Sequence, residues 1–394
     1  MEFIIDATEL RTLLMMTKDG LPQGRVSHPI LEYGLFEVSK GQASDTEGIQ
    51  DNDELACTFF NLSLGCTGAI PCQVIEPGAV CIPAKKLLEY IPKVSGKLHC
   101  KLIEADGELT VEIAGARSDL KLRCLPIDEF PDMPEVSGNL RQLPLNICQG
   151  LIKATLATSK DENKQALTTV HLETEHDKAI IASTDGNILF IGEYPYSGKE
   201  ININLPKDIL KALGKLIAPA SKQESPEIQL TYNEKYCLFM AGNFSVFHTL
   251  PECKYPEFKE LIPADMNGYE IQVMRKELQD ITERVGVLSA GDNNLISLTI
   301  GDDSLLVNSK ENQIGNARDS IPAGILPPSG NITGICSELW LNHNLLQTGL
   351  KILQGEQEIR INWCDSAVRP ITLSPMQKNH KEIFLLMPVR LRTA

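Results

Sequence analysis

The stretch LPIDEFPDMPE, residues 125–135, has a close copy later in the chain: LPECKYPEFKE, residues 250–260. Both read Leu-Pro, three residues, an aromatic residue, Pro and then an acidic residue. Proline cannot donate a hydrogen bond to a sheet ladder, so each Leu-Pro pair is expected to end a strand. We interpret each copy as a corner that closes one structural unit and leads into the next.

Helix signals repeat in step with this corner. Pro83 and Pro206 each stand at the start of a predicted helix, a position where the missing N–H of proline costs nothing. A third helical pattern starts at Asn342 and keeps leucines at helical spacing. Each of these three helices has another helical pattern further upstream. The upstream patterns cover residues 8–19, 144–160 and 274–289.

Strand pairs with alternating apolar residues follow the second helix of each unit, and turn signals such as Asp106-Gly107 join them. A third Leu-Met-Pro corner, ending at Pro388, closes the last unit. The sequence therefore predicts an α+β fold of three repeated units, each with two helices and antiparallel sheets. The predicted domains are residues 1–137, 138–264 and 265–394.

The overall composition limits the classes of function. The chain has 394 residues and a formal net charge of −15, whereas proteins that grip nucleic-acid phosphates are usually basic. The N-terminus lacks the pattern of a signal peptide, and no apolar run approaches the ~18 residues of a membrane helix. The eleven cysteines form no C-x-x-C pair. We interpret them as reduced, buried residues of a cytoplasmic protein, with a dispersed metal site as the less favoured alternative.

The sequence gives no sign of catalysis. It contains none of the motifs G-x-x-x-x-G-K-[ST], H-E-x-x-H, G-x-S-x-G or G-x-G-x-x-G. The seven histidines are scattered without metal-ligand spacing, and Asp185 beside Gly186 is typical of a turn. We therefore expect a protein that is not an enzyme and that has no cofactor and no metal site.

Positive charge is concentrated on the predicted helices. Lysines recur there at spacings that place them on one face, opposite the apolar side of the helix. These lysines are Lys86 and Lys93, Lys153 and Lys160, and Lys207, Lys211 and Lys215. A single basic face of this kind is often only a solvated surface. Three of them in corresponding places indicate a common surface that follows a polyanion without reading its sequence.

With these features the chain resembles the bacterial DNA polymerase III beta sliding clamp family. The resemblance rests on STDGNIL from Ser183, the FPDMP and YPEFKELIP corners, RVGVLS from Arg284 and the terminal LLMPVRL, in order along the whole chain. It implies the DNA clamp fold. In that fold two three-domain chains form a head-to-tail homodimer, a six-domain ring with helices lining the hole and sheets outside.

The resemblance also implies a function. The ring would encircle double-stranded DNA without sequence specificity and act as a processivity factor. The expected partners are the DNA polymerase III alpha subunit, a clamp-loader ATPase, and other polymerases and repair proteins that carry clamp-binding peptides. Encirclement would let an acidic protein stay on DNA, because the lysines that line the hole need to make only weak, salt-sensitive contacts with the phosphates. A clamp-like scaffold that lacks efficient DNA loading is the main alternative, and an enzyme on a repeated scaffold is a third.

Three sets of site residues follow from the resemblance. The DNA-facing candidates are Arg25, Lys164, Lys207 and Lys211, together with the other helix lysines named above: Lys86, Lys93, Lys153, Lys160 and Lys215. The dimer interface places Val287 and Leu288 against the strand from Ala116 to Leu122 of the partner, where a sheet edge would otherwise stay open. The partner-peptide pocket maps to Leu167, Thr184, Gly186, Asn187, Ile188, Leu189, Pro256, Leu261, Leu385, Leu386, Met387, Pro388, Val389 and Arg390. Several of these, including Leu189, Leu386 and Met387, equally fit ordinary core positions.

The chain departs from the family pattern at four places. Asn187-Ile188 stand where the family commonly has His-Arg, and Glu260 stands where a basic residue is frequent. Residues 392–394 follow the usual terminal Arg-Leu, and the acidic stretch 42–54 is longer than expected. That stretch does not match a calcium-binding loop, so we interpret it as solvated. These departures predict a divergent pocket that disfavours acidic peptides and depends more on apolar anchors.

Overall fold

The computed structural model describes residues 1–24, 26, 28–41, 53–222, 226–262, 268–289, 294–311, 313–326, 338–363, 369–376 and 381–389. The chain forms two compact units. The first consists of Met1–Cys148 and Asp208–Glu252, and the second of Gln149–Lys207 and Cys253–Ala394. The division into three domains stays a prediction, and Ala264, where its second boundary was expected, lies outside the described residues.

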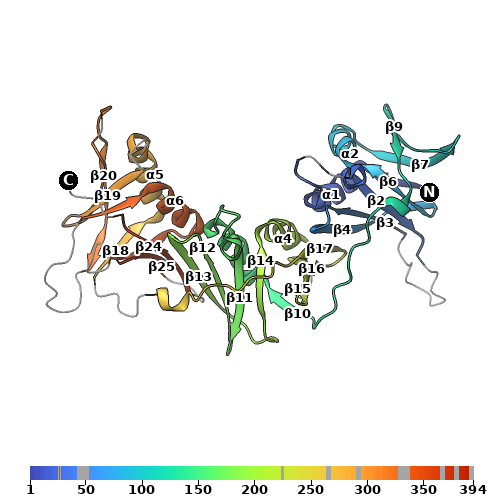
Figure 1. Ribbon diagram of the computed structural model, residues 1–394. Coiled ribbons are helices and arrows are strands. Elements are labelled where there is room, and N and C mark those ends of the chain that lie inside the picture. Colours follow the sequence, from blue (N-terminus) through green and yellow to red (C-terminus); the bar gives the residue numbers. More distant parts are fainter. Residues whose placement is uncertain are drawn as a thin grey trace. The chain divides into compact units, whose positions relative to one another are not determined.

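Six α-helices in the described part of the chain each begin directly after a strand (Figure 1). The pairs are β1 (Glu2–Asp6) with α1 (Ala7–Thr17), β6 (Gly78–Pro83) with α2 (Ala84–Tyr90), β10 (Arg141–Pro144) with α3 (Leu145–Ala154), β14 (Asn202–Pro206) with α4 (Lys207–Ala220), β18 (Tyr269–Met274) with α5 (Arg275–Gly286), and β23 (Glu338–Asn342) with α6 (His343–Ile352). The helices expected from the repeating pattern are therefore present.

The starts of these helices differ slightly from expectation. Pro83 is the N-cap of α2 and Pro206 is the last residue of β14, so both prolines precede the first helical turn instead of occupying it. Asn342 does start α6 as expected. Its side-chain oxygen accepts hydrogen bonds from the backbone N–H groups of Asn344 and Leu345, at 3.0 and 3.3 Å, which satisfies two donors that the helix leaves open.

The first unit contains two antiparallel sheets. The five-stranded sheet has the order β5-β1-β7-β8-β9, and the eight-stranded sheet has the order β10-β15-β16-β17-β4-β3-β2-β6. Their remaining strands are β2 (Tyr33–Ser39), β3 (Glu54–Phe60), β4 (Leu64–Pro71), β5 (Gln73–Glu76), β7 (Lys97–Ala105), β8 (Glu108–Ala114), β9 (Asp119–Cys124), β15 (Glu227–Tyr232), β16 (Tyr236–Ala241) and β17 (Phe244–Thr249). Asp106 and Gly107, both with positive φ, join β7 to β8 in the expected tight turn.

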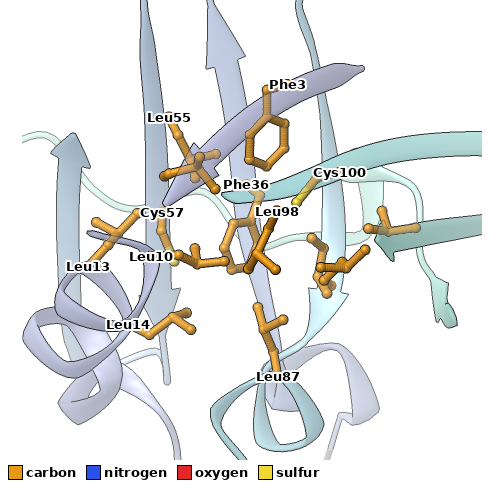
Figure 2. Close-up of a cluster of buried hydrophobic side chains, with 14 of the residues drawn as sticks. Phe3, Leu10, Leu13, Leu14, Phe36, Leu55, Cys57, Leu87, Leu98 and Cys100 are labelled. Atoms are coloured by element: carbon orange, nitrogen blue, oxygen red, sulfur yellow. The ribbon is translucent and has the colours of Figure 1, made fainter. Parts of the chain in front are cut away.

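The core of the first unit lies between its two sheets, with α1 and α2 packed against it (Figure 2). Phe3 and Leu98 come from the five-stranded sheet, and Phe36 and Leu55 come from the eight-stranded sheet. The leucines of α1 and Leu87 of α2 point into the same cluster. Alternate residues of each strand point to one face, which explains how two sheets share one core.

The second unit contains a nine-stranded and a four-stranded antiparallel sheet. The orders are β14-β11-β12-β13-β26-β25-β24-β18-β22 and β21-β20-β19-β23. The remaining strands are β11 (Thr169–Glu175), β12 (Lys178–Thr184), β13 (Ile188–Pro195), β19 (Leu295–Ile300), β20 (Ser304–Ser309), β21 (Arg318–Pro322), β22 (Gly324–Leu326), β24 (Glu358–Trp363), β25 (Ile371–Pro375) and β26 (Lys381–Leu386). The strands β13 and β26, which join at the middle of the larger sheet, are almost 200 residues apart in the sequence.

The cysteines behave as the composition suggested. All nine cysteines in the described residues are free, and most are buried. Burial raises the pKa of the Cys100 thiol to about 12, so it carries no nucleophilic thiolate near neutral pH.

The described residues hold no cluster of three or more metal-binding side chains. No helix among them is long and apolar enough to cross a membrane.

Candidate functional site

The second copy of the repeated corner packs onto the large sheet of the second unit. We use the name corner segment for residues 253–262. Tyr255 and Phe258 of this segment are almost fully buried. They form one apolar cluster with side chains of β12, β13 and β26: Ile180, Ala182, Leu189, Ile191, Ile383 and Leu385. The aromatic residue that defines the corner is thus an anchor onto the sheet.

A tight turn joins β12 to β13 beside this cluster. The Asp185 carboxylate accepts hydrogen bonds from the backbone N–H groups of Asn187 and Ile188, at 2.7 and 3.0 Å, and Gly186 has φ +98°. Only glycine adopts such a backbone conformation readily, which explains its place in the turn. Asp185 is therefore the structural turn residue that the sequence indicated. The Met387 N–H donates to the Asn187 carbonyl oxygen at 3.2 Å, which ties the C-terminal residues to this turn.

The predicted pocket residues from β13 and β26 do come together. Ile188 pairs with Leu386 and Leu189 with Leu385 in an antiparallel ladder. Successive residues of a strand point to opposite faces, so the two pairs face different sides of the sheet. Leu189 and Leu385 face the corner segment. Ile188 and Leu386 are consequently on the opposite face, where Phe384 of the same strand lies against Gly349 of α6.

Burial divides the predicted pocket set into core and surface residues. Thr184, Ile188, Leu189, Leu385 and Leu386 are at least 94 % buried in the chain. By contrast, Leu261 is 57 % and Met387 is 43 % exposed. Gly186, Asn187 and Pro256 are also exposed, whereas Leu167, Pro388 and Val389 are half-buried, and Arg390 lies outside the described residues.

This division corrects one expectation. Ile188 was expected to add an apolar side chain to the pocket surface in place of a basic residue of the family. Its side chain is only 4 % exposed, and the strand register turns it toward the core. Among the predicted pocket residues that the structure describes, the exposed large apolar side chains are instead those of Leu261 and Met387.

A polar cleft of about 440 Å³ lies between the corner segment and the strands β11 and β14. The His171 ring of β11 stacks on the Tyr255 ring, with centroids 4.9 Å apart and planes within 12°. Lys259 of the corner segment lies 2.9 Å from Glu173 and 3.0 Å from Glu175 of β11. None of these three residues of β11 was identified from the sequence, because their partners are more than 80 residues away.

The buried carboxylate of Glu382 on β26 is hydrogen-bonded to Tyr194 of β13. Glu382 is 1 % exposed, lies opposite Gly192 in the ladder, and accepts a hydrogen bond from the Tyr194 hydroxyl at 2.7 Å. The Lys153 ammonium of α3 lies 3.2 Å from the same carboxylate oxygen. Burial, and then the negative charge of Glu382, raise the pKa of Tyr194, so this phenol stays protonated as a donor. The charge of Glu382 is therefore compensated inside the unit.

Two of the predicted DNA-facing lysines are engaged within the chain. Lys153 is held by Glu382, as described above. Lys215 forms an ion pair with the nearly buried Asp19 at 2.7 Å and donates to the Met15 carbonyl oxygen at the same distance. Lys215 is therefore engaged by other parts of the first unit, and its role toward DNA stays a prediction.

The remaining lysines of this set are solvent-exposed. Lys86 forms a short-range ion pair with Glu89 at the surface of α2. Lys207 and Lys211 form no ion pair within the described part of the chain and lie side by side on α4. The other exposed members are Lys93, Lys160 and Lys164, and Arg25 lies outside the described residues.

The predicted dimer residues lie on or next to the edge strand β9 and at the end of helix α5. Strand β9, which contains Leu122, is the last strand of the five-stranded sheet, and β21 is the last strand of the four-stranded sheet. Val287 is 73 % exposed at the end of α5, and Leu288 beside it is half-buried. In the same unit Arg284 of α5 forms an ion pair at 2.6 Å with Asp319 of β21. Ala116 is exposed, whereas Leu122 is 8 % exposed and belongs mainly to the core.

Comparisons with known proteins agree with this fold along its whole length. A family model described as the DNA polymerase III beta subunit, central domain, matches residues 142–257. A beta sliding clamp from Synechococcus elongatus is 29 % identical over 404 residues and covers all of both chains.

Solved structures agree as well. The DNA polymerase III beta subunit of Thermotoga maritima, 18 % identical, superposes with a TM-score of 0.83 over 99 % of both chains. A sliding clamp of Pseudomonas aeruginosa bound to griselimycin, 19 % identical, gives the same TM-score over 99 % of this chain and all of the other.

The sequence relative from Synechococcus elongatus and the two solved structures all match essentially the full length of the chain. On these grounds the chain is similar over its full length to DNA polymerase III beta subunits, the beta sliding clamps.

Proposed function

We propose that this protein is a DNA sliding clamp: a non-catalytic processivity factor that encircles duplex DNA and tethers polymerases to it. The full-length likeness to beta sliding clamps, with all six strand–helix units present, carries this proposal. The exposed lysines of α4 provide contacts of the kind that bind phosphates without reading bases. The net charge of −15 opposes attachment through charge alone, which favours attachment by encirclement.

The ring requires two copies of the chain, joined head to tail. Edge strands of a sheet tend to pair with another chain unless they are covered. The edge strand β9 of one copy would meet β21 and the end of α5 in the partner copy. The exposed Val287 supports this arrangement, because it is a large apolar side chain at the end of α5, a helix whose Arg284 contacts Asp319 of the edge strand β21. Two such contacts, one at each end of the chain, close the ring.

Retention on circular DNA tests the proposal. Loaded onto a nicked circle, the protein should stay bound through gel filtration at about 0.5 M salt, where contacts to phosphates are weak. Cutting the circle once should release it, since a ring slides off a free end. Release that does not depend on cutting would contradict encirclement and would favour the alternative, a clamp-like scaffold without effective loading. Tight, salt-resistant binding to a short linear duplex would contradict both.

We further propose that polymerases and other partners bind through short peptides at the exposed apolar surface around Leu261 and Met387. The partners we expect are the DNA polymerase III alpha subunit, the clamp-loader ATPase, and repair proteins with clamp-binding peptides. Leu261 lies in the corner segment and Met387 directly follows β26, and these two elements contribute Phe258 and Leu385 to one buried cluster. Methionine adapts its shape to different ligands, which suits a site that serves several partners.

Replacing Met387 with alanine should weaken the binding of such a peptide by about tenfold. The side chain is 43 % exposed, and covering the exposed part of a methionine is worth roughly 1–2 kcal/mol. The measurement is a titration of a fluorescent peptide that has Gln followed two residues later by two apolar anchors. Met15, which is 45 % exposed on α1 of the first unit, provides the matched control. Equal affinities for wild type and Met387→Ala would rule out this location of the pocket.

A further inference from the structure

The corner segment contributes Pro256 and Leu261 to the proposed peptide site, but charged contacts to β11 also hold it in place. The Lys259 ammonium lies between two carboxylates of that strand, 2.9 Å from Glu173 and 3.0 Å from Glu175. These hydrogen bonds, first to Glu173 and then to Glu175, raise the pKa of Lys259, so the ammonium stays charged at neutral pH. Neither carboxylate belongs to the peptide site.

Two further contacts hold the beginning of the corner segment. The Tyr255 ring stacks on the His171 ring of β11, and the amide of Asn204 on β14 donates to the Cys253 carbonyl oxygen at 2.8 Å. Asn204 and His171, which face each other across β14 and β11, are joined by a hydrogen bond of 2.8 Å. The segment is thus attached at both of its ends to the same pair of strands.

These contacts indicate what the polar cleft does. Several of its polar groups already bind one another: His171 binds Asn204, Asn204 binds the Cys253 carbonyl, and Glu173 binds Lys259. A site built to bind a polar ligand would leave such groups open for the ligand. The cleft is therefore better explained as an attachment of the corner segment than as a separate ligand site.

We propose that Lys259 is a positioning residue for peptide binding, which acts through its ion pairs with Glu173 and Glu175. Lys259 and Leu261 belong to the same single 3-10 turn, η7 (Lys259–Leu261), in which the Leu261 N–H donates to the Phe258 carbonyl oxygen at 3.1 Å. Holding the first residue of this turn fixes the orientation of the last one. This inference rests on the proposed peptide site, because it concerns how Leu261 is presented there.

The experiment compares wild type with Lys259→Met, which keeps the length of the side chain but removes the charge, and with Lys259→Arg, which keeps the charge. Lys178→Met is the matched control: Lys178 lies opposite Glu175 in the ladder, but it forms its ion pair with Glu193, at 2.9 Å, and not with the corner segment. Because exposed ion pairs contribute little, we expect Lys259→Met to bind the peptide about three- to fivefold more weakly. Lys259→Arg should restore most of the affinity, and Lys178→Met should leave it unchanged.

Salt provides a readout that a purely structural loss would not change. With a peptide that carries no net charge, wild-type affinity should fall between about 50 and 500 mM NaCl, because salt screens the ion pairs of Lys259. In Lys259→Met this decrease should be absent. Unchanged affinity in Lys259→Met, or the same salt dependence in both proteins, would overturn the inference while leaving the peptide site in place.

A measurement without peptide separates the two proposals. Hydrogen exchange at the backbone amide of Leu261 should be several-fold faster in Lys259→Met than in wild type or Lys178→Met, because the 3-10 turn opens more often. If wild type bound no peptide, the proposed peptide site would fail, whereas the exchange result would still decide whether Lys259 holds the turn. Equal exchange in all three proteins would refute the role of Lys259.

Discussion

A chain with aspartate in place of Val287 is expected to sediment as a monomer at concentrations where the wild-type protein is a dimer. Val287 is 73 % exposed in the single chain, so the change should not disturb the fold. In the proposed ring this side chain is buried against the partner, and its burial is worth about 1.5–3 kcal/mol. An aspartate there would lose this contribution and would bury an unpaired carboxylate, which adds a further cost. The dimer should dissociate at least about a hundredfold more readily.

Val287 gives a cleaner test of the interface than Leu288, because Leu288 is half-buried and its replacement could disturb the chain itself. Ile75→Asp is a suitable control. Ile75 is 43 % exposed on β5, at the opposite edge of the sheet from β9, and the change introduces the same charge. Val287→Asp should lose retention on circular DNA together with its dimer, and Ile75→Asp should keep both. A Val287→Asp chain that stays dimeric with an unchanged melting temperature would contradict the proposed ring.

The fold was predictable because its signals are local and repeated. The proline and asparagine at the helix starts, the helical spacing of leucines and the Asp106-Gly107 turn each depend on a few neighbouring residues. Their recurrence through the chain gave the order of helices and strands. The pairing of β13 with β26 was different, because those strands are remote in sequence and no local pattern specifies their register.

The candidate site was predictable only in part, for the same reason. The residue types of the pocket could be carried over from the family, but the strand register decides which of them reach the surface. Leu386 and Ile188 are in the core because they face away from the corner segment, while Met387, one residue beyond the strand, is exposed. The ion pair of Lys215 with Asp19 could not be predicted from the sequence either, because the position of Lys215 on its helix is also typical of a solvent-exposed residue.

Removing the buried carboxylate of Glu382 should produce the largest loss of stability among these variants. Glu382 is 1 % exposed and compensates the charge of Lys153 while accepting the hydrogen bond of Tyr194. In Glu382→Ala the ammonium and the hydroxyl would lose this carboxylate as a partner. Removing one partner of a buried ion pair typically lowers the free energy of unfolding by about 3–5 kcal/mol. Urea unfolding followed by tryptophan fluorescence measures this directly, because Trp340 and Trp363 are the two tryptophans of the chain and both belong to the second unit.

The cause of that loss can be separated from simple cavity formation. In the triple variant Glu382→Leu, Tyr194→Phe and Lys153→Met, all three polar groups are replaced by apolar groups of similar size. Such replacement of a whole buried network is often neutral, so most of the lost stability should return. Glu193→Gln, which removes the partly exposed carboxylate that pairs with Lys178 and Lys381, should cost less than about 1 kcal/mol. If the triple variant were as unstable as Glu382→Ala, the unpaired charge would not be the cause, and loss of packing between β13 and β26 would explain the effect instead.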